Sequence, residues 1–70
     1  MQAAAIIAMP LAEAGDPEAQ RMIGEMYFEG QGLPVSKSAA FKWNLASANQ
    51  GDRLAQYSVG YLYETGQGIA

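Results

Sequence analysis

The feature that most constrains the fold is a repeated stretch, "YFEGQGL" over residues 27–33 and "YETGQGI" over residues 63–69. The two stretches lie 36 positions apart, and sliding the chain by this distance gives twelve identical pairs among 34 overlapping ones. Conservative pairs such as Ile23 with Val59 add to the identities. A fixed period of about 20–50 residues is typical of a solenoid, whose units bury apolar surface against their neighbours. The repeat therefore predicts a small stack of similar units.

Each unit begins with a pattern typical of a helix. Asp16 can cap free backbone N–H groups, and Pro17 follows at the first helical position, where its missing N–H costs nothing. Gly30 can adopt the left-handed conformation that ends a helix, so we expect the Gly-Gln-Gly stretch to stop the helix and reverse the chain. The second unit repeats this pattern from Asp52 to Gly66.

A second helix is predicted from Ser36, which can cap it, to about Gln50, where Gly51 closes it. Its apolar residues spread around most of its circumference, so this helix must be covered on more than one side. Residues 3–14 align with this helix as the second helix of a preceding unit. Pro10 lies within that segment, and we expect it to remove one backbone hydrogen bond and to kink or fray the helix.

Two glycines and three aromatic residues are expected to mark the contacts between helices. Gly24 and Gly60 lie in the middle of predicted helices, at a cost of about 1 kcal/mol each relative to alanine, and would permit close approach of a neighbouring helix. Trp43, Tyr27 and Tyr63 are interpreted as packing residues whose polar ends need a hydrogen-bond partner.

Three long stretches of the chain resemble a known family, the Sel-one-like repeats, which are helical solenoids related to tetratricopeptide repeats. They are "AEAGDPEAQRMIGEMYFEGQGL", "SKSAAFKWNLASANQGD" and "AQYSVGYLYETGQGI". Departures from the family pattern are modest: Ser36 stands where the family usually has aspartate, Asn44 where it often has an aromatic residue, and Ser47 where alanine is common. The resemblance implies stacked helix pairs that assemble complexes through a groove lined by first helices.

The predicted fold is therefore all-α, an antiparallel helix-pair solenoid of about two 36-residue repeats in one small domain, residues 1–70. Residues 1–15 are expected to form the second helix of a preceding unit, residues 16–51 a complete repeat, and residues 52–70 the first helix and turn of a truncated repeat. The outer side of the last helix would then be an uncovered solenoid end.

Composition excludes several classes of function. The chain has no cysteine and no histidine, which removes thiol chemistry, imidazole acid–base catalysis, disulfides and Cys/His zinc sites. The net charge is −3, and the four basic residues are scattered, so no positive stripe is available for nucleic acid. We expect no cofactor and no nucleic-acid partner.

The first residues resemble a signal peptide only superficially. The apolar run over residues 3–9 is short, and no lysine or arginine precedes it. No run approaches the roughly 18 apolar residues of a membrane span, so no membrane partner is expected. The absence of cysteine fits a reducing compartment and favours a cytoplasmic location.

Catalytic interpretations compete poorly with structural ones. The loop "GQGLPVSKS" ends in Lys-Ser like a phosphate-binding loop but lacks two of its glycines and follows no predicted strand. Glu25 and Glu29 lie one helical turn apart and could face a cation or act as an acid–base pair. A small hydrolase that uses this pair remains an alternative, but we interpret both residues as part of a solvated helix face.

A more informative pattern lies on the first helices, away from their predicted core face. Aromatic residues occur there at positions that packing does not require, and exposed tyrosine and phenylalanine commonly anchor interfaces. The alternative is that Leu54 and Tyr57 pack on the preceding second helix. The predicted partner-binding residues are Arg21, Glu25, Phe28, Tyr57, Tyr61 and Glu64.

The function predicted from the sequence is a non-catalytic scaffold that binds a protein or peptide through this first-helix face. The alternative is a self-assembling structural unit, or a fragment of a longer repeat array, that completes its core by homo-oligomerisation through exposed solenoid ends. No metal site and no catalytic residue is assigned.

Overall fold

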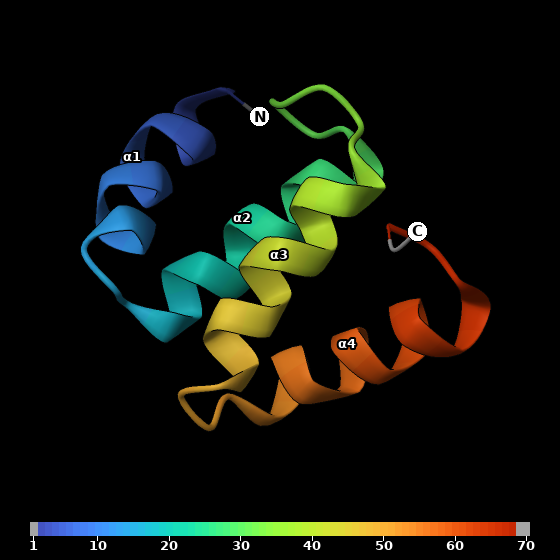
Figure 1. The fold of residues 1–70 in the computed structure, drawn as a ribbon. Coiled ribbons are helices and arrows are strands. Elements are labelled where there is room, and N and C mark those ends of the chain that lie inside the picture. The colour runs from blue at the N-terminus through green and yellow to red at the C-terminus, as the bar shows by residue number, and fades with distance from the viewer. Residues whose placement is uncertain (1, 69–70) are drawn as a thin grey trace.

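The structure of the protein is a computed structural model, in which residues 2–68 are described. It contains the helices α1 (Gln2–Glu13), α2 (Pro17–Glu29), α3 (Lys37–Ala48) and α4 (Arg53–Thr65), and no strand occurs within the described range. These helices confirm the predicted all-α class (Figure 1). Ile69, the predicted counterpart of Leu33, and the first and last residues of the predicted units lie outside the described residues.

The ends of α2 and α4 are set by the same local chemistry. The carboxylate of Asp16 accepts hydrogen bonds from the backbone N–H groups of Glu18 at 2.9 Å and Ala19 at 3.3 Å. Asp52 accepts one from the N–H of Ala55 at 2.9 Å. Each helix stops at a left-handed glycine, Gly30 with φ 74° and Gly66 with φ 71°. The predicted caps and glycine stops are therefore confirmed for α2 and α4.

Helix α3 starts as predicted but ends earlier. The hydroxyl of Ser36 accepts a hydrogen bond from the N–H of Ala39 at 3.2 Å. The helix then stops at Ala48, two residues before the predicted end, because the N–H groups of Gln50 and Gly51 donate to carbonyls only three residues back. A tight turn of this kind replaces the last helical turn.

The predicted fraying at Pro10 is wrong, since α1 continues through this residue to Glu13. Proline leaves the carbonyl four residues earlier without its helical donor, and here that carbonyl belongs to the exposed residue Ile6. Water can reach such a position, and the opposite face of α1 is held by packing. The buried residues of that face are Ala5, Ala8 and Ala12.

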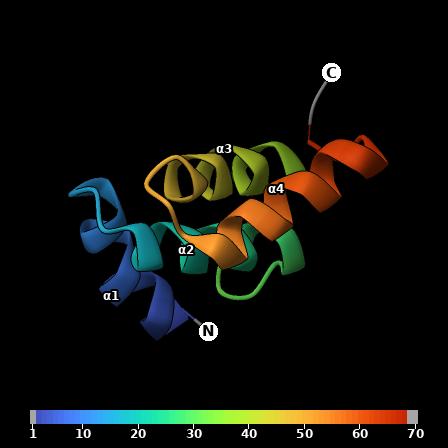
Figure 2. The same ribbon diagram turned by 90° about the horizontal axis from the view of Figure 1, so that it is seen from below.

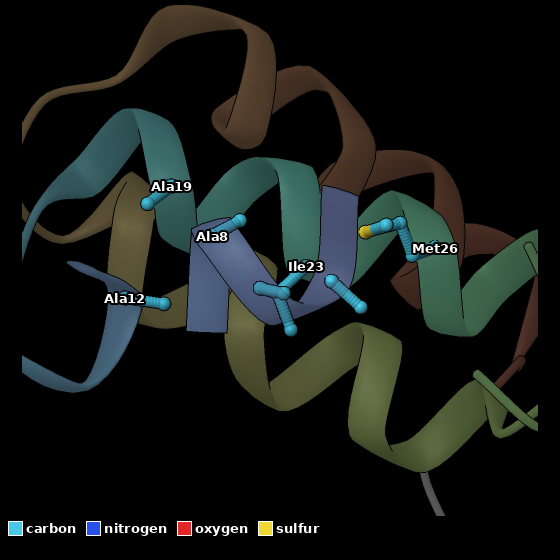
Figure 3. Packing of buried hydrophobic residues seen from close by; sticks show 6 residues of the cluster. Ala8, Ala12, Ala19, Ile23 and Met26 are labelled. Atoms are coloured by element: carbon cyan, nitrogen blue, oxygen red, sulfur yellow. The ribbon is translucent and has the colours of Figure 1, made fainter. Parts of the chain in front are cut away.

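The helices stack in chain order, with α1 on α2, α2 on α3 and α3 on α4 (Figures 1 and 2). The main core lies between α1 and α2, where small alanine side chains surround Ile23, which is fully buried (Figure 3). Trp43 and Tyr27 pack against this core, as predicted. Because α3 contacts both α2 and α4, the prediction that it is covered on more than one side is confirmed.

Two packing predictions for α4 are wrong. Tyr63 is 69% exposed, and the position that a Cβ atom of Gly60 would occupy has no neighbour within 4 Å. The equivalent residue Gly24 does face a close neighbour, since an added Cβ would lie 2.9 Å from Cγ of Asn44. The difference arises because α2 lies between α1 and α3, whereas α4 packs mainly on α3.

Candidate functional site

A groove of about 240 Å³ lies where α2, α3 and α4 meet. Residues of α2 and α4 at helical spacings of three and four line its two sides, and α3 contributes one buried residue. The groove runs between two first helices, as the family resemblance implies. Its lining residues are Glu25, Phe28, Glu29, Asn44, Tyr57, Ser58, Tyr61 and Leu62.

The groove brings together four of the six residues that the sequence predicts for partner binding: Glu25, Phe28, Tyr57 and Tyr61. Tyr57 is 77% exposed, and Tyr61 and Glu25 are also exposed. The two remaining residues do not line the groove. Glu64 and Tyr63 line a second, more open hollow along α4, which shares Tyr57 and Tyr61 with the groove.

Arg21, the remaining predicted residue, joins α2 to the start of α4. Its Nε donates a hydrogen bond to Oδ2 of Asp52 at 3.2 Å, and its guanidinium also contacts the Glu25 carboxylate at 3.4 Å. Partial burial by itself lowers the pKa of Arg21, but the hydrogen bond and charge of Asp52, helped by Glu25, outweigh this effect and raise it. The guanidinium therefore links α2 to the first turn of α4.

The pKa of Asp52 is lowered because its carboxylate both caps α4 and pairs with Arg21. The largest cause is the backbone N–H of Ala55, which donates to the carboxylate as the helix cap. Desolvation opposes this effect, and the hydrogen bond and charge of Arg21 lower the pKa further. The ionised carboxylate is thus stabilised by the start of α4 and by the neighbouring unit together.

Phe28 is half-buried at the edge of the groove and already contacts a cation. The Nζ atom of Lys37 lies 3.5 Å from the centroid of its ring and donates a hydrogen bond to the backbone carbonyl of the same residue at 2.8 Å. An ammonium over an aromatic face is attracted by the ring quadrupole. This contact ties the start of α3 to the end of α2.

As site residues, the sequence prediction missed Asn44, Ser58 and Leu62. It considered Glu29 together with Glu25 as a possible cation-facing or acid–base pair and preferred a solvated helix face. Asn44 and Leu62 are buried, whereas Glu29 is exposed. The polar residue Asn44 was visible in the sequence as a departure from the aromatic residue of the family pattern. A polar side chain at a core position is an unusual choice, because its burial costs free energy unless it is hydrogen-bonded.

Within residues 2–68 no group of three or more acidic, histidine or cysteine side chains is arranged to hold a metal ion. None of the described helices combines the length and apolar character needed to cross a membrane.

Stacked helix pairs with a groove between their first helices define the class of helical-repeat proteins. The Sel1 repeat matches residues 17–52 and 53–70, which is more than half of the chain, and the protein therefore belongs to the Sel1 repeat family. No curated protein and no solved structure matches the chain. Sel1 repeats generally serve as scaffolds for protein–protein interaction and are typically non-catalytic.

Proposed function

We propose that the chain is a non-catalytic scaffold that binds a protein or peptide segment across its first helices, through the face formed by Arg21, Glu25, Phe28, Tyr57, Tyr61 and Glu64. The observation that carries this proposal is the groove between α2 and α4, which four of these six residues line. Neither a cofactor nor a nucleic-acid or membrane partner forms part of the proposal.

The exposed tyrosines are the strongest part of this face. Tyr57 and Tyr61 lie one turn apart on α4 and present aromatic surface to solvent beside a concave site. Tyrosine buries a large area at a low cost in rotamer entropy, which makes it a frequent anchor of interfaces. Arg21 is half-buried and held by two carboxylates, so its part is to fix the relative position of the two helices.

The test is selection of a displayed library of random heptapeptides on the wild-type chain. We expect enriched peptides whose affinity falls at least about tenfold when Tyr57 and Tyr61 are both replaced by serine. Tyr63→Ser is the matched control, because this residue is also an exposed tyrosine of α4 but does not line the groove. Circular dichroism should show unchanged helicity in all variants. Enriched peptides that bind the double variant normally would contradict the proposal.

A second candidate function, self-assembly, is favoured by the two ends of the stack. By the 36-residue register, α1 corresponds to α3 and α4 corresponds to α2. Trp43 of α3 packs against the core, but its counterpart Ile7 on α1 is exposed. In the same way, Tyr27 of α2 packs against the core, but its counterpart Tyr63 on α4 is exposed. The α1 face of a second copy could therefore cover α4 as α3 covers α2.

Such a head-to-tail contact is open-ended, so light scattering should show a mass that rises with concentration. Ile7→Glu and Tyr63→Glu should each give a monomer, since each places a charge in the contact. Mixing the two variants should restore a one-to-one dimer, because each retains one intact end. A wild-type chain that stays monomeric at all concentrations would exclude this function and leave adjoining repeats of a longer chain as the cover of these faces.

The division of the chain into residues 1–15, 16–51 and 52–70 remains a proposal. It is supported by the agreement of the 36-residue register with the order of the helices. On this division, the groove forms between the first helix of one unit and the first helix of the next.

A further inference from the structure

One of the residues that line the groove, Asn44, carries a buried polar atom without a hydrogen-bond partner among the described residues. Asn44 is only 2% exposed, and its Nδ2 donates a hydrogen bond to the carbonyl of Ala40 at 2.9 Å. Its Oδ1 has no hydrogen-bond partner among the described residues. More than about 90% of buried polar groups have such a partner. An unpaired acceptor that belongs to the lining of a groove therefore points to a donor that comes from outside the chain.

The position of this amide is fixed by packing. Asn44 faces Gly24 of α2, and a Cβ atom at that glycine would lie 2.9 Å from Cγ of Asn44 and 3.2 Å from the carbonyl oxygen of Ala40. The glycine therefore leaves the space that the amide occupies. A side chain held in this way does not need to be ordered when a partner arrives, which reduces the entropic cost of binding.

The charges around the groove select the kind of donor. Two carboxylates, Glu25 and Glu29, line it, and no basic residue does. The ammonium of Lys37 lies over the ring of Phe28 and is held there by the carbonyl of the same residue. Glu25 forms an ion pair with Arg21, whereas no ion pair within residues 2–68 involves Glu29. Half of the other lining residues are aromatic, namely Phe28 on the side of α2 and Tyr57 and Tyr61 on the side of α4. Carboxylates beside aromatic faces favour a cation.

The size of the groove favours a single side chain over a small molecule. Its volume of about 240 Å³ lies below the range of roughly 300–1,000 Å³ that is typical of small-molecule sites. An arginine side chain fits the unpaired acceptor of Asn44, the carboxylates beside aromatic rings and the small size of the groove. Its planar guanidinium can stack on a tyrosine ring, and its five N–H donors can reach a carboxylate and an amide oxygen at once. A lysine ammonium offers a point charge without the planar surface.

We infer that the groove is a receptor for an arginine side chain of a partner protein, whose guanidinium donates to Oδ1 of Asn44, stacks on Tyr57 or Tyr61 and pairs with Glu29. This inference rests on the proposed binding function and adds the chemistry of the partner. Arg21 does not compete for the site, because its guanidinium is held by Asp52 and Glu25.

The test uses the peptides enriched from the heptapeptide library, synthesised with a fluorescent label and measured by anisotropy. We expect an arginine in every enriched family. Replacing it by lysine should weaken binding about fivefold or more, and by the uncharged isostere citrulline about tenfold or more. Glu29→Gln should weaken the arginine peptide, whereas Glu13→Gln should not, because Glu13 gives the same change in charge at the exposed end of α1.

The most specific readout is the preference for arginine over lysine. Asn44→Leu removes the unpaired oxygen and replaces the amide by an apolar side chain with the same number of heavy atoms. It should therefore reduce the ratio of the arginine to the lysine affinity toward one. If this variant does not fold, the peptide substitutions and the Glu29 variant still decide the question. Peptides that bind in the groove without arginine would overturn this inference and leave the binding function standing. Peptides that ignore the Tyr57 and Tyr61 substitutions, or no enrichment at all, would overturn both.

Discussion

Helices α2 and α4 share a sequence pattern but not an environment. Both begin at a capping aspartate and end at a left-handed glycine, and six further positions within them carry identical or conservatively exchanged residues. Ile23 of α2 is fully buried, while its counterpart Val59 on α4 is half-buried. Tyr27 packs against the core, and Tyr63 is exposed to solvent.

This difference separates two kinds of information in a repeat. The caps and turns form in both units because they depend on atoms a few residues apart. Burial depends on whether a second helix lies on each side, which α2 has and α4 has only in part. Repetition of sequence therefore repeats the helix but not its contribution to stability. Substitutions at corresponding positions of α2 and α4 should therefore separate the effect of local helix structure on stability from the effect of burial.

The largest contrast is expected at the core positions. Ile23→Ala should lower the free energy of unfolding by about 2–5 kcal/mol, because it removes fully packed methyl groups and leaves a cavity. Val59→Ala should cost below about 1 kcal/mol, since part of its surface is already in water. Urea titration followed by circular dichroism measures both values. Equal losses would mean that α4 is covered as fully as α2 in solution.

The two helix glycines should respond with opposite signs. Gly24→Ala should destabilise the fold by about 1–3 kcal/mol, because its methyl group meets Asn44 and the carbonyl of Ala40. Gly60→Ala should stabilise it by about 1 kcal/mol, because the position is open and alanine favours helix. The melting temperatures of both variants, compared with that of the wild type, show the sign of each effect. Destabilisation by Gly60→Ala would indicate that something covers α4.

The smallest effect is expected where the two units are joined by charge. The pKa of Asp52 is lowered in the folded state, so its ionised form adds stability that is present above the ordinary value of about 3.9 and is lost as the pH falls through the folded value. The melting temperature of the wild type should therefore fall below about pH 4. Asp52→Asn should show a shallower fall and, at pH 7, a loss of about 1 kcal/mol or less.

Arg21→Gln is the companion variant for this measurement, because it removes the ion pair and leaves the cap of α4 in place. It should flatten the same part of the pH profile to a smaller extent. A pH profile identical to that of the wild type in both variants would show that Asp52 does not couple the units.

The predictable parts of the fold were those with short-range causes. Asp16 and Gly30 set the ends of α2, and Asp52 and Gly66 repeat this for α4, because each acts on neighbouring backbone groups. Pro10 was misjudged for the complementary reason. A local rule predicts disruption, but α1 is held by the packing of its buried alanines on α2.

The candidate site was predicted in part. Spacing on the helices located Glu25, Phe28, Tyr57 and Tyr61, since residues one turn apart share a face. Asn44 was missed because it approaches the groove from α3, through a contact with Gly24 that is 20 residues away in the sequence. Nothing in a helical pattern indicates that such an amide oxygen is left without a partner.

By itself, the sequence determined where α2 and α4 begin and end and that their pattern recurs after 36 residues, because capping and glycine conformation are local properties. Only the tertiary structure decided which faces are covered, where the groove lies and which polar atom in it has no partner. These properties arise from contacts between helices distant in the chain, and two similar helices acquire different surfaces when different neighbours pack on them.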